Sequence, residues 1–114
     1  MQNQNNLHIL WSNDNQHTSQ FLVFFYATQS KVHKHWENVT VILWGAPVKT
    51  ITENKVLQEE LHLAKLAGVH FSACTSCANK FGVTEQLQEL GVEIFPWTEP
   101  FTQLVKQNAP IVYA

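Results

Sequence analysis

The chain has 114 residues, a net charge of −2 at pH 7 and only 14% charged residues. This length is enough for one domain with a hydrophobic core that needs neither disulfides nor metal to hold it. All seven basic residues are lysines, whereas a nucleic-acid surface favours arginine forks and a basic patch. We therefore expect a single domain with no nucleic-acid partner.

The N-terminal segment 1–6 is polar and lacks the basic and apolar regions of a secretory signal. We expect it to be disordered and one domain to span residues 7–114. The longest apolar run, residues 21–27, is too short to cross a bilayer. These features predict a cytosolic protein without a membrane partner. In such a reducing compartment, paired cysteines are more often redox-active, sulfur-carrying or metal-binding than joined in a structural disulfide.

The first half of the chain alternates strand and helix patterns. Residues 7–11 and 39–44 are short apolar runs, typical of buried strands. Residues 16–33 predict a helix that is apolar on more than one side, so we expect the sheet on one side and another subunit on the other. Residues 52–67 have the clearest helical spacing, and Gly68 is the expected stop.

The second half continues the alternation with shorter elements. Three strands are expected at residues 69–73, 92–95 and 111–113. Three helices are expected at residues 77–81, from Thr84 as N-cap, and from Thr98 to about Gln107. Strands that alternate with helices imply a mainly parallel sheet with helices on both faces. The predicted fold class is therefore α/β.

Both cysteines of the chain, Cys74 and Cys77, stand where the third predicted strand ends and a helix could begin. The first turn of a helix has unpaired N–H groups and a partial positive charge, which favour thiolate over thiol. We expect Cys74 to lie nearer the helix N-terminus and the solvent, as the nucleophile. Cys77, one turn in, would resolve a mixed disulfide or persulfide. Simple packing of two buried cysteines is the alternative reading.

Loops that follow the strands of a parallel sheet emerge at one edge, where ligands bind. This edge should therefore bring further side chains to the cysteines. The candidate binding residues are Asn13, Asp14, Trp44, Gly45, Pro47 and Trp97.

Other kinds of site find less support. His8 and His70 fall inside strands, as hydrogen-bonded core or edge histidines. A structural zinc site needs four ligands, and the chain has one C-x-x-C pair without a second pair. A catalytic triad is disfavoured because Asp14 is the sole aspartate and no nucleophile elbow occurs. We expect neither a metal nor a cofactor. Four other histidines should face solvent: His17, His33, His35 and His62.

A series of segments carries a resemblance to a known family: LWGAPVK at 43–49, LQEEL at 57–61, Gly68-Val69 leading to ACTSCA at 73–78, then Gly82-Val83 and LGVE at 90–93. With them, the chain resembles the DsrE/DsrF-like family of YchN-like fold, in its two-cysteine subgroup, over residues 7–114. The resemblance implies a three-layer α/β/α fold around a five-stranded, mainly parallel sheet. It also implies assembly as trimers or hexamers.

The family resemblance further implies a sulfur-carrier role. A cysteine after the third strand would accept sulfur as a persulfide and pass it to a partner protein, and Cys74 matches that position. A thioredoxin-type oxidoreductase fits less well, because its pair follows the first strand of its core motif. Two other classes stay open: a non-enzymatic ligand-binding or assembly protein with structural cysteines, and a module in which thiolates of several subunits bind a metal.

Overall fold

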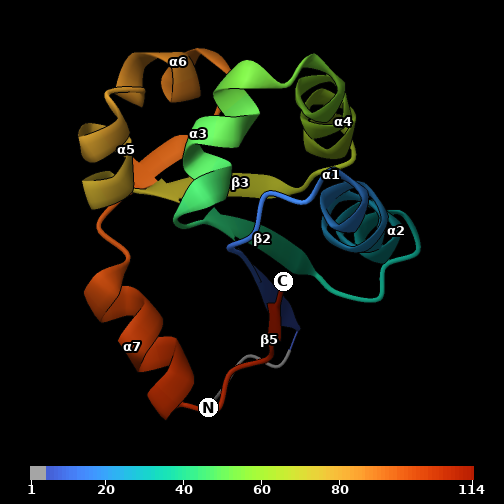
Figure 1. Cartoon of the computed structure of the whole chain (residues 1–114). Coiled ribbons are helices and arrows are strands. Elements are labelled where there is room, and N and C mark those ends of the chain that lie inside the picture. Colours follow the sequence, from blue (N-terminus) through green and yellow to red (C-terminus); the bar gives the residue numbers. More distant parts are fainter. Residues whose placement is uncertain (1–4) are drawn as a thin grey trace.

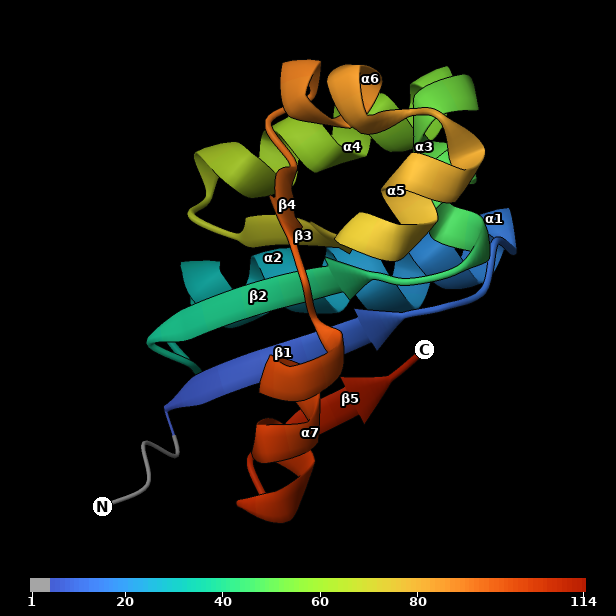
Figure 2. The same ribbon diagram turned by 90° about the vertical axis from the view of Figure 1, so that its left-hand side faces the viewer.

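The computed structural model describes residues 5–114. Its centre is one sheet of five strands in the order β4-β3-β2-β1-β5, as Figures 1 and 2 show. The strands are β1 (Asn6–Trp11), β2 (Asn38–Leu43), β3 (His70–Cys74), β4 (Glu93–Phe95) and β5 (Ile111–Tyr113). Every neighbouring pair is parallel. The predicted α/β class with a five-stranded parallel sheet is confirmed.

Helical segments connect successive strands. They are α1 (Gln16–Thr18), the π-helical segment η1 (Ser19–Phe24), α2 (Phe25–Val32), α3 (Ala46–Glu53), α4 (Lys55–Leu66), α5 (Thr75–Phe81), α6 (Thr84–Glu89) and α7 (Thr98–Lys106). The helix predicted over 16–33 is thus a continuous helical stretch that widens to π geometry in its middle.

The strand order places the helices in two unequal layers. Strands β1 to β4 lie side by side in sequence order, so their right-handed crossovers put α1 to α6 on one face. The chain then returns across the whole sheet from β4 to β5, which puts α7 on the opposite face. Figures 1 and 2 show α7 standing apart from the other helices. We call these two sides of the sheet the core face and the α7 face.

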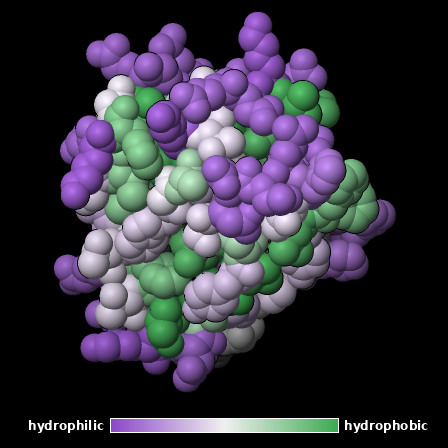
Figure 3. All heavy atoms as spheres, viewed as in Figure 1, coloured by the Kyte–Doolittle hydropathy of each residue, from purple (hydrophilic) through white to green (hydrophobic). Residues whose placement is uncertain are grey.

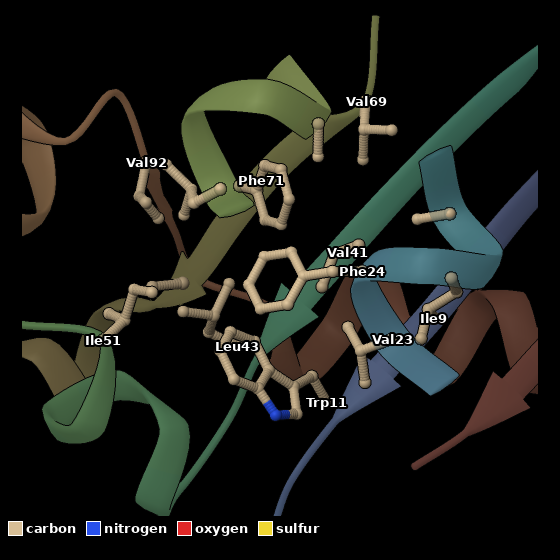
Figure 4. Packing of buried hydrophobic residues seen from close by; sticks show 14 of the residues in the cluster. Ile9, Trp11, Val23, Phe24, Val41, Leu43, Ile51, Val69, Phe71 and Val92 are labelled. Carbon is tan, nitrogen blue, oxygen red and sulfur yellow. The ribbon is translucent and has the colours of Figure 1, made fainter. Parts of the chain in front are cut away.

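The main hydrophobic core fills the core face. Alternate residues of the strands point into it, among them Ile9, Val41 and Phe71, and no residue of α7 belongs to this cluster. Figure 4 shows the rings of Phe24 and Phe71 facing each other in its centre; their centroids lie 5.8 Å apart. Because successive residues of a strand point to opposite faces, every second residue of β1 and β2 is buried in this core.

Helix α3 was not predicted, and the helix expected at 52–67 is divided in two. Gly45 adopts φ +81° and ψ −135° at the N-cap of α3, a conformation close to the glycine-only region. This turn lets a helix start at Ala46. The break between α3 and α4 falls at Asn54, whose side chain accepts a hydrogen bond of 3.0 Å from Leu57 N and caps α4.

Several predicted boundaries shift by a residue or more. Val83, not Thr84, is the N-cap of α6, and the Thr84 hydroxyl donates to Asn79 Oδ1 at 3.3 Å. Asn6 is part of β1 and is not disordered. For residues 1–4, the expectation of disorder lies outside the described part of the chain. Within residues 5–114, no helix is long and apolar enough to span a membrane.

Candidate functional site

The two cysteines lie 4.3 Å apart at the carboxyl end of β3, and both are free. Cys74 is the last residue of the strand and the N-cap of the seven-residue helix α5. Its exposed fraction is 2%, whereas Cys77 on α5 is only partly buried. The predicted difference in exposure is therefore reversed. The reason is that β3 continues through Cys74, so the sheet itself encloses this side chain.

The two cysteines also belong to different sides of the sheet. Residues Phe71 and Ala73 of β3 belong to the main core, and Cys77 packs against that core from α5. Cys74 alternates with Ala73 along the strand and therefore points to the α7 face, together with Ser72. The pair thus stands at the carboxyl edge of the sheet, where its two faces meet.

A partly buried hydrogen-bond cluster lies near Cys74 on the α7 face. Trp97 Nε1 donates to Ser72 Oγ at 2.8 Å, and Ser72 Oγ donates to Glu93 Oε1 at 3.1 Å. His70 Nε2 lies 3.6 Å from the same carboxylate oxygen. Sequence reasoning selected Trp97 but missed Ser72 and Glu93. Only the register of β3 against β4, which pairs Ser72 with Glu93, brings these two residues together.

His8 extends this cluster onto β1. Its ring meets Trp97 edge-on, with centroids 6.0 Å apart, and its buried Nδ1 has no hydrogen-bond partner. Burial lowers the pKa of His8 below 6.5, and the nearby His70 lowers it further. Among the described residues, no group of three or more side chains is arranged to hold a metal ion. The other four histidines are all exposed, as predicted.

The loop after β2 lies next to the cysteines because β2 is the neighbour of β3 in the sheet. Trp44 is partly buried, donates its backbone N–H to Trp11 O at 3.1 Å and meets the Phe101 ring edge-on at 5.6 Å. Pro47 is buried in the first turn of α3, and this helix contacts α5. Gly45 and Pro47 therefore form the start of the helix that packs against α5, the helix of Cys77.

Asn13 and Asp14 lie farther from the cysteines. They follow β1, and β2 stands between β1 and β3. The Asn13 side chain accepts a hydrogen bond of 3.0 Å from Asn15 N, so it stabilises its own turn. Asp14 is exposed. The other four predicted binding residues follow β2 or β4, the two strands next to β3. Asn13 and Asp14 follow β1, which β2 separates from β3.

An apolar surface covers the outside of η1, α2 and α4. Phe21 is 71% exposed and Leu63 is 64% exposed, and together with Phe25 they line a shallow groove of about 300 Å³. Figure 3 shows green, apolar atoms at the surface at the right of the view, in the region of α1 and α2. Single exposed apolar residues are common, but a contiguous patch marks an interaction surface.

Comparisons with known proteins agree with this architecture. The chain belongs to the DsrE/DsrF-like family, whose pattern it matches over residues 3–109. It is also similar to a solved structure, described as a conserved protein of unknown function from Bacteroides thetaiotaomicron. The two chains are 31% identical, with a TM-score of 0.93, over 96% of this chain and 95% of the other. No curated protein matches the sequence significantly.

Proposed function

We propose that this protein carries sulfur on the Cys74/Cys77 pair, as a sulfurtransferase-like accessory protein. A donor persulfide, on a small thiol or on a partner protein, gives its outer sulfur atom to a protein thiol. The donor leaves as a thiol, and the protein holds a cysteine persulfide. No net oxidation occurs, because the sulfane sulfur only changes its thiol partner.

The observation that carries this proposal is the pair itself. Two free cysteines lie 4.3 Å apart at the carboxyl edge of a parallel sheet, and one of these residues is partly exposed. Ligands of open α/β sheets bind at this edge. Membership of the DsrE/DsrF-like family supports a role in sulfur relay or a related process. Such a carrier needs no bound cofactor.

The proposal is tested by incubating native protein with glutathione persulfide and following the sulfane sulfur. The measured quantity is the sum of protein-bound sulfur, determined by cyanolysis, and free sulfide. Wild type should consume donor to about one sulfur per chain, and the variant with both Cys74→Ala and Cys77→Ala should consume none. Equal consumption by the two proteins would exclude the proposed role.

The competing role is that of a ligand-binding or assembly protein with structural cysteines, favoured by the burial of Cys74. In that case both thiols should resist alkylation until the protein unfolds. The double variant would then lose stability while ligand binding or assembly stayed intact.

The apolar groove supports a second proposal, that the chain forms a homo-oligomer through η1, α2 and α4. Phe21 and Phe25 present apolar rings to solvent there. Phe21→Glu should shift the molecular mass measured by light scattering toward the monomer. Val105→Glu, which changes an equally apolar exposed residue on α7, is the matched control and should leave the mass unchanged.

A further inference from the structure

The two thiols of the site differ in what can reach them. Cys74 is 2% exposed at the end of β3, whereas Cys77 is partly exposed on α5. A donor persulfide is bulkier than water, and its sulfur must approach the attacking thiolate directly. An external donor can therefore meet Cys77 without any rearrangement of the sheet, while Cys74 is closed to it.

Aromatic side chains lie next to the end of β3 on the α7 face, the face to which Cys74 points. Its register partner on β4 is Phe95, whose ring packs edge-on against Trp97 at 5.1 Å. Trp97 in turn is held by its hydrogen bond to Ser72, two residues before Cys74 on the same face. Phe95 and Trp97 therefore lie beside β3 on the face to which Cys74 points, and Trp97 is itself buried.

We infer that Cys77 receives the sulfur and that Cys74 then expels it as sulfide, so that the pair is a sulfane reductase as well as a carrier. This inference rests on the proposed function, because it assumes that sulfur enters at this pair. The roles are the reverse of those predicted from the sequence, in which Cys74 is the nucleophile and Cys77 resolves the persulfide.

The chemical step balances without a bound cofactor. The Cys74 thiolate attacks the Cys77 sulfur atom of the persulfide, and a disulfide bond forms between the two cysteines. The bond to the outer sulfur breaks, and that atom leaves as hydrosulfide with the electron pair of the broken bond. Two thiol sulfurs are oxidised to a disulfide, and one sulfane sulfur is reduced to sulfide. Two external thiols then reduce the disulfide: the first attacks Cys77 and forms a mixed disulfide, which releases Cys74, and the second frees Cys77 and leaves as an external disulfide.

Proximity favours this internal step over competing reactions. The two residues lie 4.3 Å apart, and the C-x-x-C spacing is one at which disulfides form and break in redox-active proteins. A neighbouring thiolate in the same molecule acts at a very high effective concentration. The buried position of Cys74 keeps it from external oxidants and donors, so that it stays reduced until Cys77 is loaded.

The test loads wild type, Cys74→Ala and Cys77→Ala with glutathione persulfide in the absence of free thiol. Intact mass and released sulfide are then measured together. Wild type should lose the mass of two hydrogens and release one sulfide per chain. Cys74→Ala should gain the mass of one sulfur on Cys77, with sulfide release at least about tenfold lower. Cys77→Ala should take up no sulfur in the native state.

Three results would overturn the inference, and each is distinct. If Cys77→Ala binds sulfur and Cys74→Ala does not, Cys74 is the cysteine that receives the sulfur, and the carrier role stands. A stable persulfide on wild type, with no sulfide, removes the reductase step alone. If none of the three proteins binds sulfur or releases sulfide, the carrier role itself is excluded. Because Cys74 is buried, Cys74→Ser is made as a second variant, and each protein is first shown to unfold cooperatively.

Discussion

The core face of the sheet is packed with apolar side chains from η1 to α6, whereas the α7 face holds His8, Ser72 and Cys74 and carries a single short helix. None of the residues of α7 is fully buried. The main core, by contrast, draws buried residues from β1, β2 and β3 and from most of the other helices. The fold therefore depends on one face, and the other is free to carry polar groups and a thiol. Matched substitutions on the two faces test this difference.

The largest difference should come from removing one aromatic ring on each face. Phe71 is fully buried against Phe24, and Phe71→Ala should lower the free energy of unfolding by about 3–5 kcal/mol. Phe101 on α7 is only partly buried between Trp44 and Tyr113. Phe101→Ala should cost less than half as much in urea unfolding. Equal losses would show that α7 contributes to the core.

A smaller difference should come from two matching tryptophan–serine hydrogen bonds. On the core face, Trp11 Nε1 donates to Ser19 Oγ at 3.0 Å; on the α7 face, Trp97 Nε1 donates to Ser72 Oγ at 2.8 Å. Ser19→Ala leaves a buried indole N–H without an acceptor and should cost about 1–3 kcal/mol.

Ser72→Ala should lower the free energy of unfolding less than Ser19→Ala does. The half-exposed carboxylate of Glu93 lies next to Ser72 and offers the Trp97 N–H another acceptor. Thermal unfolding of both variants checks the order. A greater loss for Ser72→Ala would mean that the cluster on the α7 face is as closed as the core.

The smallest effect should be on the pH dependence of stability. The pKa of His8 is lower in the folded protein than its ordinary value, so the unfolded chain binds the proton more readily. His8 therefore contributes a loss of stability as the pH falls below about 6.5. His8→Gln should reduce the fall in unfolding free energy between about pH 7.5 and pH 5.5.

The control for His8 is His62→Gln, an exposed position on α4. It should leave the pH dependence of urea unfolding as in wild type. If His8→Gln also leaves it unchanged, the histidine does not titrate differently in the two states.

Much of the fold was predictable from local sequence patterns. The apolar runs that form β1 and β2 indicate buried strands, and their alternation with helices indicates a parallel sheet. Helix α3 was missed because Gly45 and Pro47 are typical of a turn, and the start of a helix there depends on the backbone angles of Gly45. A pattern of residue types does not determine those angles.

The candidate site was predictable in part. The C-x-x-C spacing and its place after the third strand indicate the cysteine pair, and the structure brings Trp97 to the same strand. The exposure of Cys74 depends on where β3 ends. The strand was predicted to end at residue 73 but ends at Cys74, which places this residue inside the sheet. Ser72 and Glu93 meet only through strand pairing, and no spacing along the chain reveals that register.

The most direct test of the account is the rate at which iodoacetamide alkylates each thiol in the native protein. Both cysteines lie in one tryptic peptide, residues 66–80, so fragmentation of that peptide is needed to assign the modification. The account predicts that Cys77 reacts first and that Cys74 reacts only when denaturant unfolds the sheet. Faster modification of Cys74 in the native protein would contradict it, and so would resistance of both thiols until unfolding.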